Sequence, residues 1–374
     1  KSGKKVCGAK YMRDPMGPPF RVNFIWAQRF LQTSMACTSE HGQARMIPVD
    51  WVHAPLPPKP SRKASQEQWE QYTTTCKAAR IGHIGVQRIE HLRNWLDENE
   101  AAARALWTVV DGSFTNATVL KNLPNNTVLV GRIRSDAKLY FLPEQQPSAQ
   151  GRRRSYGADA PTPEQLRLDD AQPWRRIKVF FGGQSRELRA KQLGPVRWRA
   201  AGGNTNLQLI VIAPTPYRLS QKGKLLYRQP AYIICTDPNA PLAQVVQRYL
   251  WRWDIEVNFR DQKTILGLGE AQVRTPHAVQ NVTGLSVAAY AMLLTAADMC
   301  KQTNTPHQHL PAPKWRRKKT QRATTMDLVQ NLRYELWAKA IHFSDFTKRH
   351  HHNTKPEKSI YPMESAVFYA TKYA

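Results

Sequence analysis

One predicted helix brings together side chains that could bind a metal ion and phosphate groups. It runs through PLAQVVQRYLWRWDIEVNFRDQK, Pro241–Lys263, and is apolar in its first turns. At about 100° per residue, four of its polar side chains fall on one narrow face. These four are Tyr249, Arg252, Glu256 and Lys263. Asp254 and Asp261 fall roughly opposite and should be solvated, so Glu256 is the carboxylate of this helix that we expect to point inward.

A carboxylate beside an arginine and a lysine has two plausible uses. Glu256 could form ion pairs that dock the helix onto the rest of the protein. It could instead bind a hard cation such as Mg²⁺, which prefers oxygen ligands and shares them with substrate phosphates. Arg252 and Lys263 would then neutralise and orient the scissile strand. We favour the second interpretation.

A second candidate metal ligand, Asp111, ends the apolar run WTVVD and precedes Gly112. A two-metal mechanism of phosphoryl transfer needs carboxylates from several elements, holding ions about 3.5–4 Å apart. At the end of a strand, Asp111 can place its carboxylate at the C-terminal edge of a sheet. The competing interpretation is that Asp111 only begins a turn, as aspartate before glycine often does. We favour the metal ligand.

The overall charge indicates a polyanionic partner. The 374 residues include 55 Lys and Arg against 28 Asp and Glu, a net charge of +27. Nucleic acid is the first candidate partner and an anionic membrane surface the second. We find no apolar run long enough to span a bilayer, so we expect no membrane partner. The five cysteines are never spaced as CxxC, which argues against a zinc site or a disulfide framework and favours a reducing cytosol.

The order of predicted elements indicates an α/β fold, with helices on a mixed sheet. Two strands, Arg21–Phe30 and Arg45–His53, precede a proline-rich link. A long helical stretch, Ser65–Ala102, follows, with a predicted break between glycines 82 and 85. Short apolar strands are predicted at Ala105–Val110 and Thr127–Ile133. One strand is missing at the front of this order.

The second half of the chain alternates β-rich and helical character. Four short strands are predicted in a β-rich block, at Lys138–Leu142, Ile177–Phe181, Leu207–Ile212 and Ala231–Ile234. Beyond the helix that carries Glu256, helices are predicted at Val282–Met299 and Met326–Ala340. We therefore divide the chain into the first part of a core (1–135), a β-rich insertion (136–236), the second part of the core (237–300), and a basic linker with a C-terminal helical region (301–374).

The spacing Y-x2-R-x3-E-x6-K around Glu256 resembles the signature of insertion-sequence transposases of the "IS four" group, and RYLWRWDIE resembles its aromatic context. These transposases belong to the DDE superfamily. The resemblance implies a ribonuclease-H-like, retroviral-integrase-like catalytic core with a β-rich insertion that contacts DNA. It implies that Glu256 is the catalytic glutamate and that Asp111, in VVDGSFTN, is the second aspartate. Both would bind Mg²⁺, for which Mn²⁺ can substitute.

The resemblance also implies a first catalytic aspartate, on the first strand of the core and shortly before a segment resembling KSGKK, residues 1–5. We therefore expect this aspartate upstream of Lys1, and we expect the chain to be inactive as it stands. Asp14 lies in a Pro/Gly loop and Asp50 within a strand, and neither has the required context. Asp237, in CTDPNA, is better placed to open a helix than to bind metal.

Several residues are expected to bind double-stranded DNA, as transposon ends and as target. By the resemblance, three residues around Glu256 organise the transposon-end DNA, namely Tyr249, Arg252 and Lys263. We expect Arg132 and Arg134, in VGRIRSD, to bind DNA as well. Trp198, in VRWRA, could stack an unpaired base, although a half-buried strand tryptophan is the simpler interpretation. The resemblance further implies a homodimer on DNA, and a bacterial cytoplasmic location in association with the nucleoid.

Three functions are consistent with these residues. A DNA transposase that cleaves and joins transposon ends is the leading interpretation. A non-catalytic DNA-binding protein derived from a transposase would keep affinity and lack cleavage. A ribonuclease-H-like nuclease without transposition explains the carboxylates but explains the spacing around Glu256 less well. DNA binding should weaken steeply with salt, because phosphate contacts release counterions, and metal-dependent cleavage separates the transposase from the binding protein.

Overall fold

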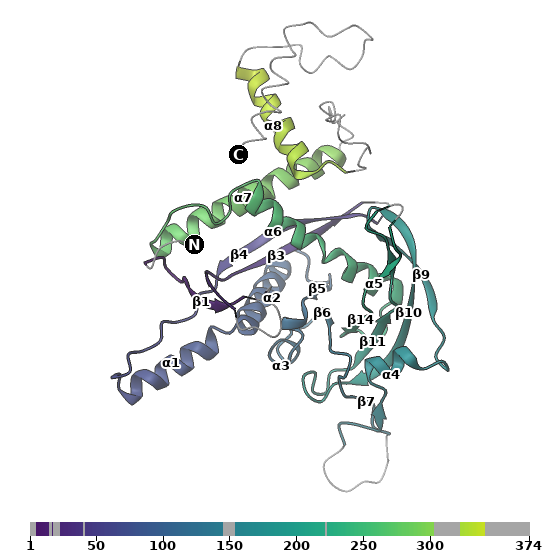
Figure 1. Ribbon diagram of the computed structural model, residues 1–374. Coiled ribbons are helices and arrows are strands. Elements are labelled where there is room, and N and C mark those ends of the chain that lie inside the picture. The colour runs from purple at the N-terminus through teal and green to yellow at the C-terminus, as the bar shows by residue number, and fades with distance from the viewer. Residues whose placement is uncertain are drawn as a thin grey trace, which may run out of the picture.

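The central element is a mixed sheet of eight strands, seen in the computed structural model (Figure 1). The structure describes residues 5–14, 17, 23–39, 42–144, 154–220, 223–302 and 322–340, so most of the predicted region 301–374 lies outside it. In spatial order the strands are β5 (Leu106–Val110), β6 (Thr127–Arg132), β14 (Ala231–Cys235), β11 (Leu207–Ile212), β10 (Gln184–Arg197), β7 (Leu139–Phe141) and β8 (Asp159–Ala160), with β9 (Arg175–Phe181) paired to β10. Only β5 and β6 are parallel to each other.

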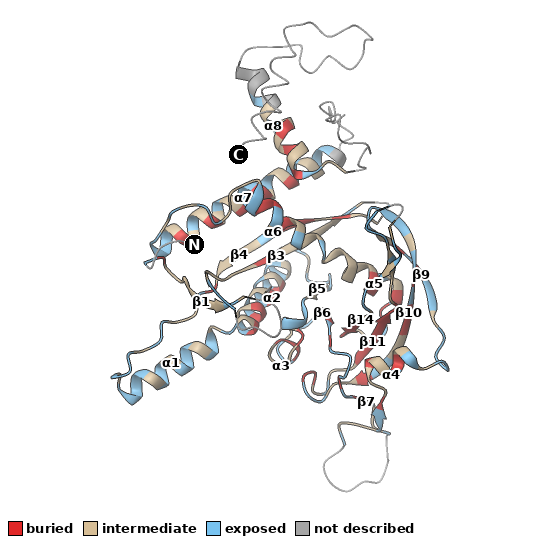
Figure 2. Ribbon diagram, in the orientation of Figure 1, coloured by how far each residue is buried: buried red, intermediate tan, exposed pale blue. Residues whose placement is uncertain are grey.

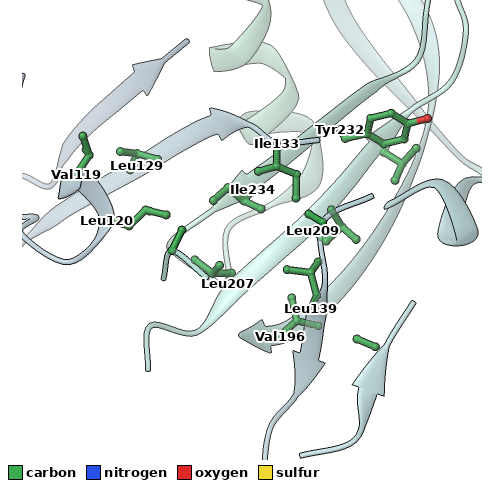
Figure 3. Packing of buried hydrophobic residues seen from close by; sticks show 14 of the residues in the cluster. Val119, Leu120, Leu129, Ile133, Leu139, Val196, Leu207, Leu209, Tyr232 and Ile234 are labelled. Carbon is green, nitrogen blue, oxygen red and sulfur yellow. The ribbon is translucent and has the colours of Figure 1, made fainter. Parts of the chain in front are cut away.

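Helices cover both faces of this sheet. On one face, Ile89 of α2 (Ile81–Glu98) and Val119 of α3 (Ala117–Leu120) belong to the same apolar cluster as Leu129 and Leu209. Figure 3 shows Val119, Leu129 and Leu209 in this cluster. On the other face, α5 (Leu242–Trp251) buries its apolar side in a second cluster. Burial on both faces explains why all six residues of β11, LQLIVI, are buried and five of them are apolar. The predicted α/β fold with helices on a mixed sheet is confirmed.

The remaining long helices pack on or beside a two-stranded ribbon, formed by β3 (Phe30–Thr38) and β4 (Ala44–His53). α6 (Asp254–Thr264) and α7 (Pro276–Gln302) both pack on β4, and α8 (Thr325–Ala340) contacts α7 (Figure 1). By length and composition, Pro276–Cys300 could cross a membrane, so the expectation that no segment is apolar enough is wrong. Its apolar residues are interspersed with small polar ones, and Tyr290 and Leu294 are buried beside β4.

The smaller elements lie at the periphery. α1 (Gln66–Ala78) begins at a capping box formed by Ser65 and Gln68, and none of its residues is buried (Figure 2). The others are β1 (Lys10–Arg13) with β2 (Phe24–Ala27), β12 (Pro216–Tyr217) with β13 (Leu226–Tyr227), the 3₁₀ turn η1 (Gly112–Phe114) and α4 (Pro163–Leu168).

The sequence-based boundaries hold for most strands of the central sheet and fail elsewhere. The predicted strand Arg21–Phe30 was wrong, because the structure has β2 at Phe24–Ala27 and a separate strand, β3, from Phe30 to Thr38. β5, β6, β9, β11 and β14 lie within about two residues of their predicted limits. The long helical stretch does break, but at Ala79 and Arg80, slightly before the predicted glycines. β10, the longest strand, was not predicted. Strands of the predicted insertion pair directly with β6 through β14, so the insertion extends the sheet of the core rather than forming a sheet of its own.

A polar contact beside β14 gives the fold a measurable dependence on pH. Hydrogen bonds from Arg167 and Tyr232 lower the pKa of Glu164 from 4.5 to about 2. A depressed carboxyl pKa stabilises the folded state above pH 4.5, and this stabilisation is lost as the pH falls toward 2. We expect Glu164→Gln to unfold at a lower temperature than the parent at neutral pH, and the difference to shrink between pH 4.5 and 2. Thermal unfolding followed by circular dichroism across this range measures it, and a difference independent of pH would contradict the assignment.

Candidate active site

Asp111 lies at the C-terminal end of β5, on the side of the sheet that α5 covers. Side chains alternate along a strand, and Trp107 and Val109 of β5 pack in the same apolar cluster as Tyr249 and Leu250. The extended backbone of Asp111 (φ −75°, ψ 162°) continues this alternation by one more step. Its side chain is exposed and accepts a hydrogen bond from the Gly112 N–H at 2.7 Å. The other carboxylate oxygen has no hydrogen-bond partner in the part of the chain that the structure describes.

Two glycines let the turn after Asp111 pack closely against its neighbours. A Cβ at Gly131, which pairs with Val110, would lie 2.2 Å from Thr115 Oγ1. A Cβ at Gly85 of α2 would lie 2.8 Å from the ring of Phe114. The Thr115 hydroxyl in turn donates to the Asp111 carbonyl at 3.3 Å. The position of Asp111 therefore depends on η1 fitting between α2 and β6.

We expect Gly131→Ala to destabilise the fold by about 1–3 kcal/mol, because its methyl group overpacks this contact. The free energy of unfolding in urea measures the effect. Gly284→Ala is the matched control, since nothing lies within 4 Å of a Cβ at that position in α7. It should stabilise the helix by about 0.5–1 kcal/mol or leave it unchanged. Equal effects of the two substitutions would contradict the close packing at Gly131.

α5 is fixed on the sheet by its first turns and by a cation–aromatic contact. Val245 and Val246 are fully buried in the cluster beneath α5. The Arg248 guanidinium lies 3.8 Å from the centroid of the Trp107 ring. Burial lowers the pKa of Arg248, as expected for a guanidinium held against an indole and away from water. This contact joins α5 to the strand that ends at Asp111.

The predicted single helix from Pro241 to Lys263 is two helices in the structure. α5 ends at Trp251 and α6 begins at Asp254. Around the junction the backbone makes i to i−3 hydrogen bonds, from Arg252 N–H to Tyr249 O and from Glu256 N–H to Trp253 O. Such bonds belong to a tighter turn with fewer residues per turn. The side chains after the junction are therefore rotated relative to an unbroken α-helix.

Three of the four predicted helical residues contact one another. The Arg252 guanidinium lies 6.0 Å from the centroid of the Tyr249 ring and 3.7 Å from the Glu256 carboxylate. Tyr249 is partly buried, whereas the Glu256 side chain is 47% exposed. Lys263, two turns further along α6, is exposed on the same side. The Arg252–Glu256 pair is therefore not the buried ion pair that would dock this helix.

The prediction that Asp254 and Asp261 are solvated was wrong. Asp261 is buried, 6% exposed, and accepts hydrogen bonds from Thr325 Oγ1 at 2.7 Å and from Arg260. Asp254 is partly buried and pairs with Arg322 at 3.1 Å. Glu256 is thus the outward carboxylate of α6, and not the inward one. The tight turn at the junction rotates α6, and β4 and the Ala323–Thr325 segment cover the face predicted to be solvated.

The remaining predicted site residues lie at two places. The parallel register pairs Val110 with Gly131, so Asp111 and Arg132 follow at the same edge of the sheet. Arg134 is 85% exposed and makes a two-point ion pair with Asp136, which lowers the pKa of that carboxyl. Trp198 follows β10 and packs, partly buried, against the cluster beneath α2. That position matches the half-buried tryptophan, the simpler of the two interpretations.

The aspartates set aside in the sequence have structural partners. Asp50, on β4, is 13% exposed and makes a two-point ion pair with Arg88 at 2.6 and 3.0 Å. Asp237 accepts from the Asn239 N–H in the turn before α5. Asp14 lies in the loop between β1 and β2. None of them joins Asp111 or Glu256 in a cluster.

The donor chemistry at Asp111 and Glu256 suits a divalent cation but does not complete a site. Each offers carboxylate oxygens without a hydrogen-bonded partner among the described residues, and hard cations prefer such oxygens. No group of three His, Cys, Asp or Glu side chains within the described ranges is placed to hold a metal ion. A metal site at either carboxylate therefore needs further ligands.

Part of the chain, including Asp111, is similar to a known protein family. Residues 28–205 match the sequence model of a family described as DDE superfamily endonuclease, a little under half of the chain. The matched part contains Asp111, Arg132, Arg134 and Trp198 and ends before the helices of Glu256. No curated protein matches the sequence. Residues 28–205 are therefore similar to DDE superfamily endonucleases, which generally use divalent metals.

Proposed function

We propose that the chain is the core of a DNA transposase that cleaves transposon ends and transfers the freed strand to target DNA. The observation that carries this proposal is one connected arrangement on the α5 side of the sheet. It links the β5 face that ends at Asp111, through Trp107 and Arg248, to the Tyr249–Arg252–Glu256 contacts. The net charge of +27 suits a DNA substrate.

In this proposal the side chains divide the work of phosphoryl transfer. Asp111 and Glu256 would hold Mg²⁺, or Mn²⁺ in its place, which supplies charge stabilisation and lowers the pKa of an attacking water. Arg252 and Lys263 contact phosphate oxygens and keep the scissile strand oriented. Arg132, beside Asp111, and the exposed Arg134 hold the flanking duplex. We further propose that the DNA-bound form is a homodimer, located in the cytoplasm with the nucleoid.

A third carboxylate is part of the proposal. Within the described ranges β5 pairs only with β6, and β3 pairs only with β4, so each has an edge without a strand partner. A strand at the edge of β5 would place its C-terminal residues next to Asp111, because parallel strands end at the same edge. We propose that such a strand, parallel to β5, carries the first aspartate.

Cleavage of a supercoiled plasmid carrying the element's ends tests the function. A chain extended by its native upstream residues should nick this DNA with Mg²⁺ or Mn²⁺ and not with EDTA, while the present chain should bind without nicking. Binding without cleavage by both chains would support the alternative, a non-catalytic DNA-binding protein, which the absence of a three-carboxylate group within the described residues also favours. Nicking without strand joining would instead support a nuclease.

A further inference from the structure

A cavity of about 560 Å³ lies where α6, β4 and the beginning of α8 meet. Asp254, Val257 and Asp261 of α6 line one side of it. At about 100° per residue these positions lie on the opposite face of the helix from Glu256, so the cavity is separate from the proposed metal site. Its volume is within the range of sites that bind small molecules, about 300–1,000 Å³.

The charged side chains of the cavity include one more cation than they do carboxylates. Among the described residues, three arginines and two aspartates line it. Arg322 pairs with Asp254 at 3.1 Å, and Arg260 pairs with Asp261 at 2.9 Å. Both carboxylates are therefore already neutralised, and the third arginine, Arg45, is left over.

Arg45 lies beside another cation and away from bulk water. Its guanidinium donates to the Ala323 carbonyl at 2.8 Å and makes no ion pair with any residue that the structure describes. Burial and the neighbouring charge of Arg322 lower the pKa of Arg45 to about 10, as expected when two guanidinium groups approach each other. A buried cation without a counter-ion costs free energy. An anion bound between Arg45 and Arg322 would remove that cost.

The rest of the lining indicates which kind of anion fits. The N-terminus of α8 lies at the cavity, but the Thr324 N–H and hydroxyl both donate to the Asp327 carboxylate at 2.8 Å. The arginines, and not the helix end, are therefore the available donors. Planar guanidinium groups match the geometry of phosphate oxygens. Met46 and Leu294 add apolar surface beside them, which suits a ligand with a body larger than a lone phosphate ion.

We propose that this cavity binds a small phosphate-bearing molecule of about the size of a mononucleotide. Its phosphate lies between Arg45 and Arg322, and its body lies against Met46 and Leu294. A bound ligand contacts β4, α6 and the beginning of α8 together, and so links the helix that carries Glu256 to the β3–β4 ribbon. This binding activity goes beyond the proposed function and does not depend on it.

Isothermal titration calorimetry with adenosine monophosphate (AMP), without DNA or metal, tests the site. AMP should bind the unaltered chain more tightly than inorganic phosphate does. Arg45→Met should weaken AMP binding by about 10- to 150-fold, the effect of losing a hydrogen bond to a charged group. Because this variant also loses the contact with Ala323, Val257→Phe is a second one. It fills the cavity without removing a hydrogen bond and should weaken binding at least about tenfold.

Arg176→Met is the matched control, because it removes the same charge from β9, where the side chain is 78% exposed. It should leave AMP binding unchanged. Equal weakening by Arg176→Met would show that AMP responds only to the net charge of the chain and would overturn the site. So would the absence of AMP binding to the unaltered chain, or unchanged binding by both Arg45→Met and Val257→Phe. Inorganic phosphate that binds as tightly as AMP would overturn a ligand of mononucleotide size.

A competition with oligo(dT) separates the two sources of phosphate. AMP that stays bound in an equal concentration of oligo(dT) supports a small-molecule ligand. AMP that oligo(dT) displaces would assign the cavity to a DNA phosphate and overturn the small-molecule ligand. Nicking of plasmid DNA remains an independent test of the proposed function, so the two proposals can fail separately.

Discussion

Glu256→Gln is expected to reduce metal-dependent nicking by the upstream-extended chain at least about 100- to 1,000-fold, the size of effect seen when one group that stabilises a transition state is lost. The amide keeps the shape of the side chain and removes the charge that would hold the cation. The side chain is 47% exposed, so folding should be unaffected. Nicking of supercoiled plasmid with Mn²⁺ measures the loss, and DNA binding measured in parallel should change by less than about threefold.

Two further variants serve as comparisons, one at a carboxylate far from the site, Glu90, and one at the second proposed metal ligand, Asp111. Glu90→Gln, on the exposed side of α2, should nick DNA like the parent. Asp111→Asn should lose as much activity as Glu256→Gln, and the double variant should lose little more, because residues that act as a unit are not additive. Unchanged nicking by Glu256→Gln would remove Glu256 from the metal site.

Arg93→Met is expected to have the largest effect on stability, because two backbone carbonyls lose their donor at a cost of about 1–3 kcal/mol each. Arg93 is 3% exposed and donates to the carbonyls of Arg104 and Ala101 at 2.6 and 3.2 Å, and to the Asp97 carboxylate. Methionine fills a similar volume but leaves both carbonyls without this donor. The carbonyls belong to the loop that leads into β5, so the loss should also loosen the strand that ends at Asp111. Urea unfolding measures the free energy.

Arg134→Met is the matched control for Arg93→Met, because Arg134 is an exposed arginine that also pairs with an aspartate. Its ion pair with Asp136 lies in solvent, so Arg134→Met should leave the urea midpoint unchanged. A midpoint for Arg93→Met equal to that of the parent would show that Arg93 does not hold the loop before β5.

The pattern of apolar residues along the sequence predicted the apolar strands but did not predict β10. β5, β6, β11 and β14 are short runs of β-branched and apolar residues, and their pattern alone indicates strands. β10 reads QSRELRAKQLGPVR, with charges at most positions facing one side. Its apolar residues Leu188, Ala190 and Val196 are buried, but Lys191 is buried too, donating to three carbonyls at the end of α4. That pairing is tertiary, so no local pattern could have revealed it.

The spacing along the sequence predicted which residues of α5 and α6 lie together, but the direction in which Glu256 points depends on tertiary contacts. Tyr249, Arg252 and Glu256 are close in sequence, and their contacts follow from any helical path. The inward or outward direction of Glu256 depends on the tight turn at the junction and on Arg322, which is distant in sequence and pairs with Asp254. Gly131 was missed as a determinant of the position of Asp111, since only the fold brings Thr115 to it.

The most direct test of the central claim is iron-mediated cleavage of the polypeptide in the upstream-extended chain. Fe²⁺ bound in place of Mg²⁺ generates hydroxyl radicals in the presence of ascorbate and peroxide, and these cut the backbone close to the ion. If Asp111 and Glu256 hold the same metal centre, mass spectrometry of the fragments should find cuts next to both residues, and excess Mg²⁺ should suppress both. Cuts at only one of them, or cuts that excess Mg²⁺ does not suppress, would contradict a shared metal centre.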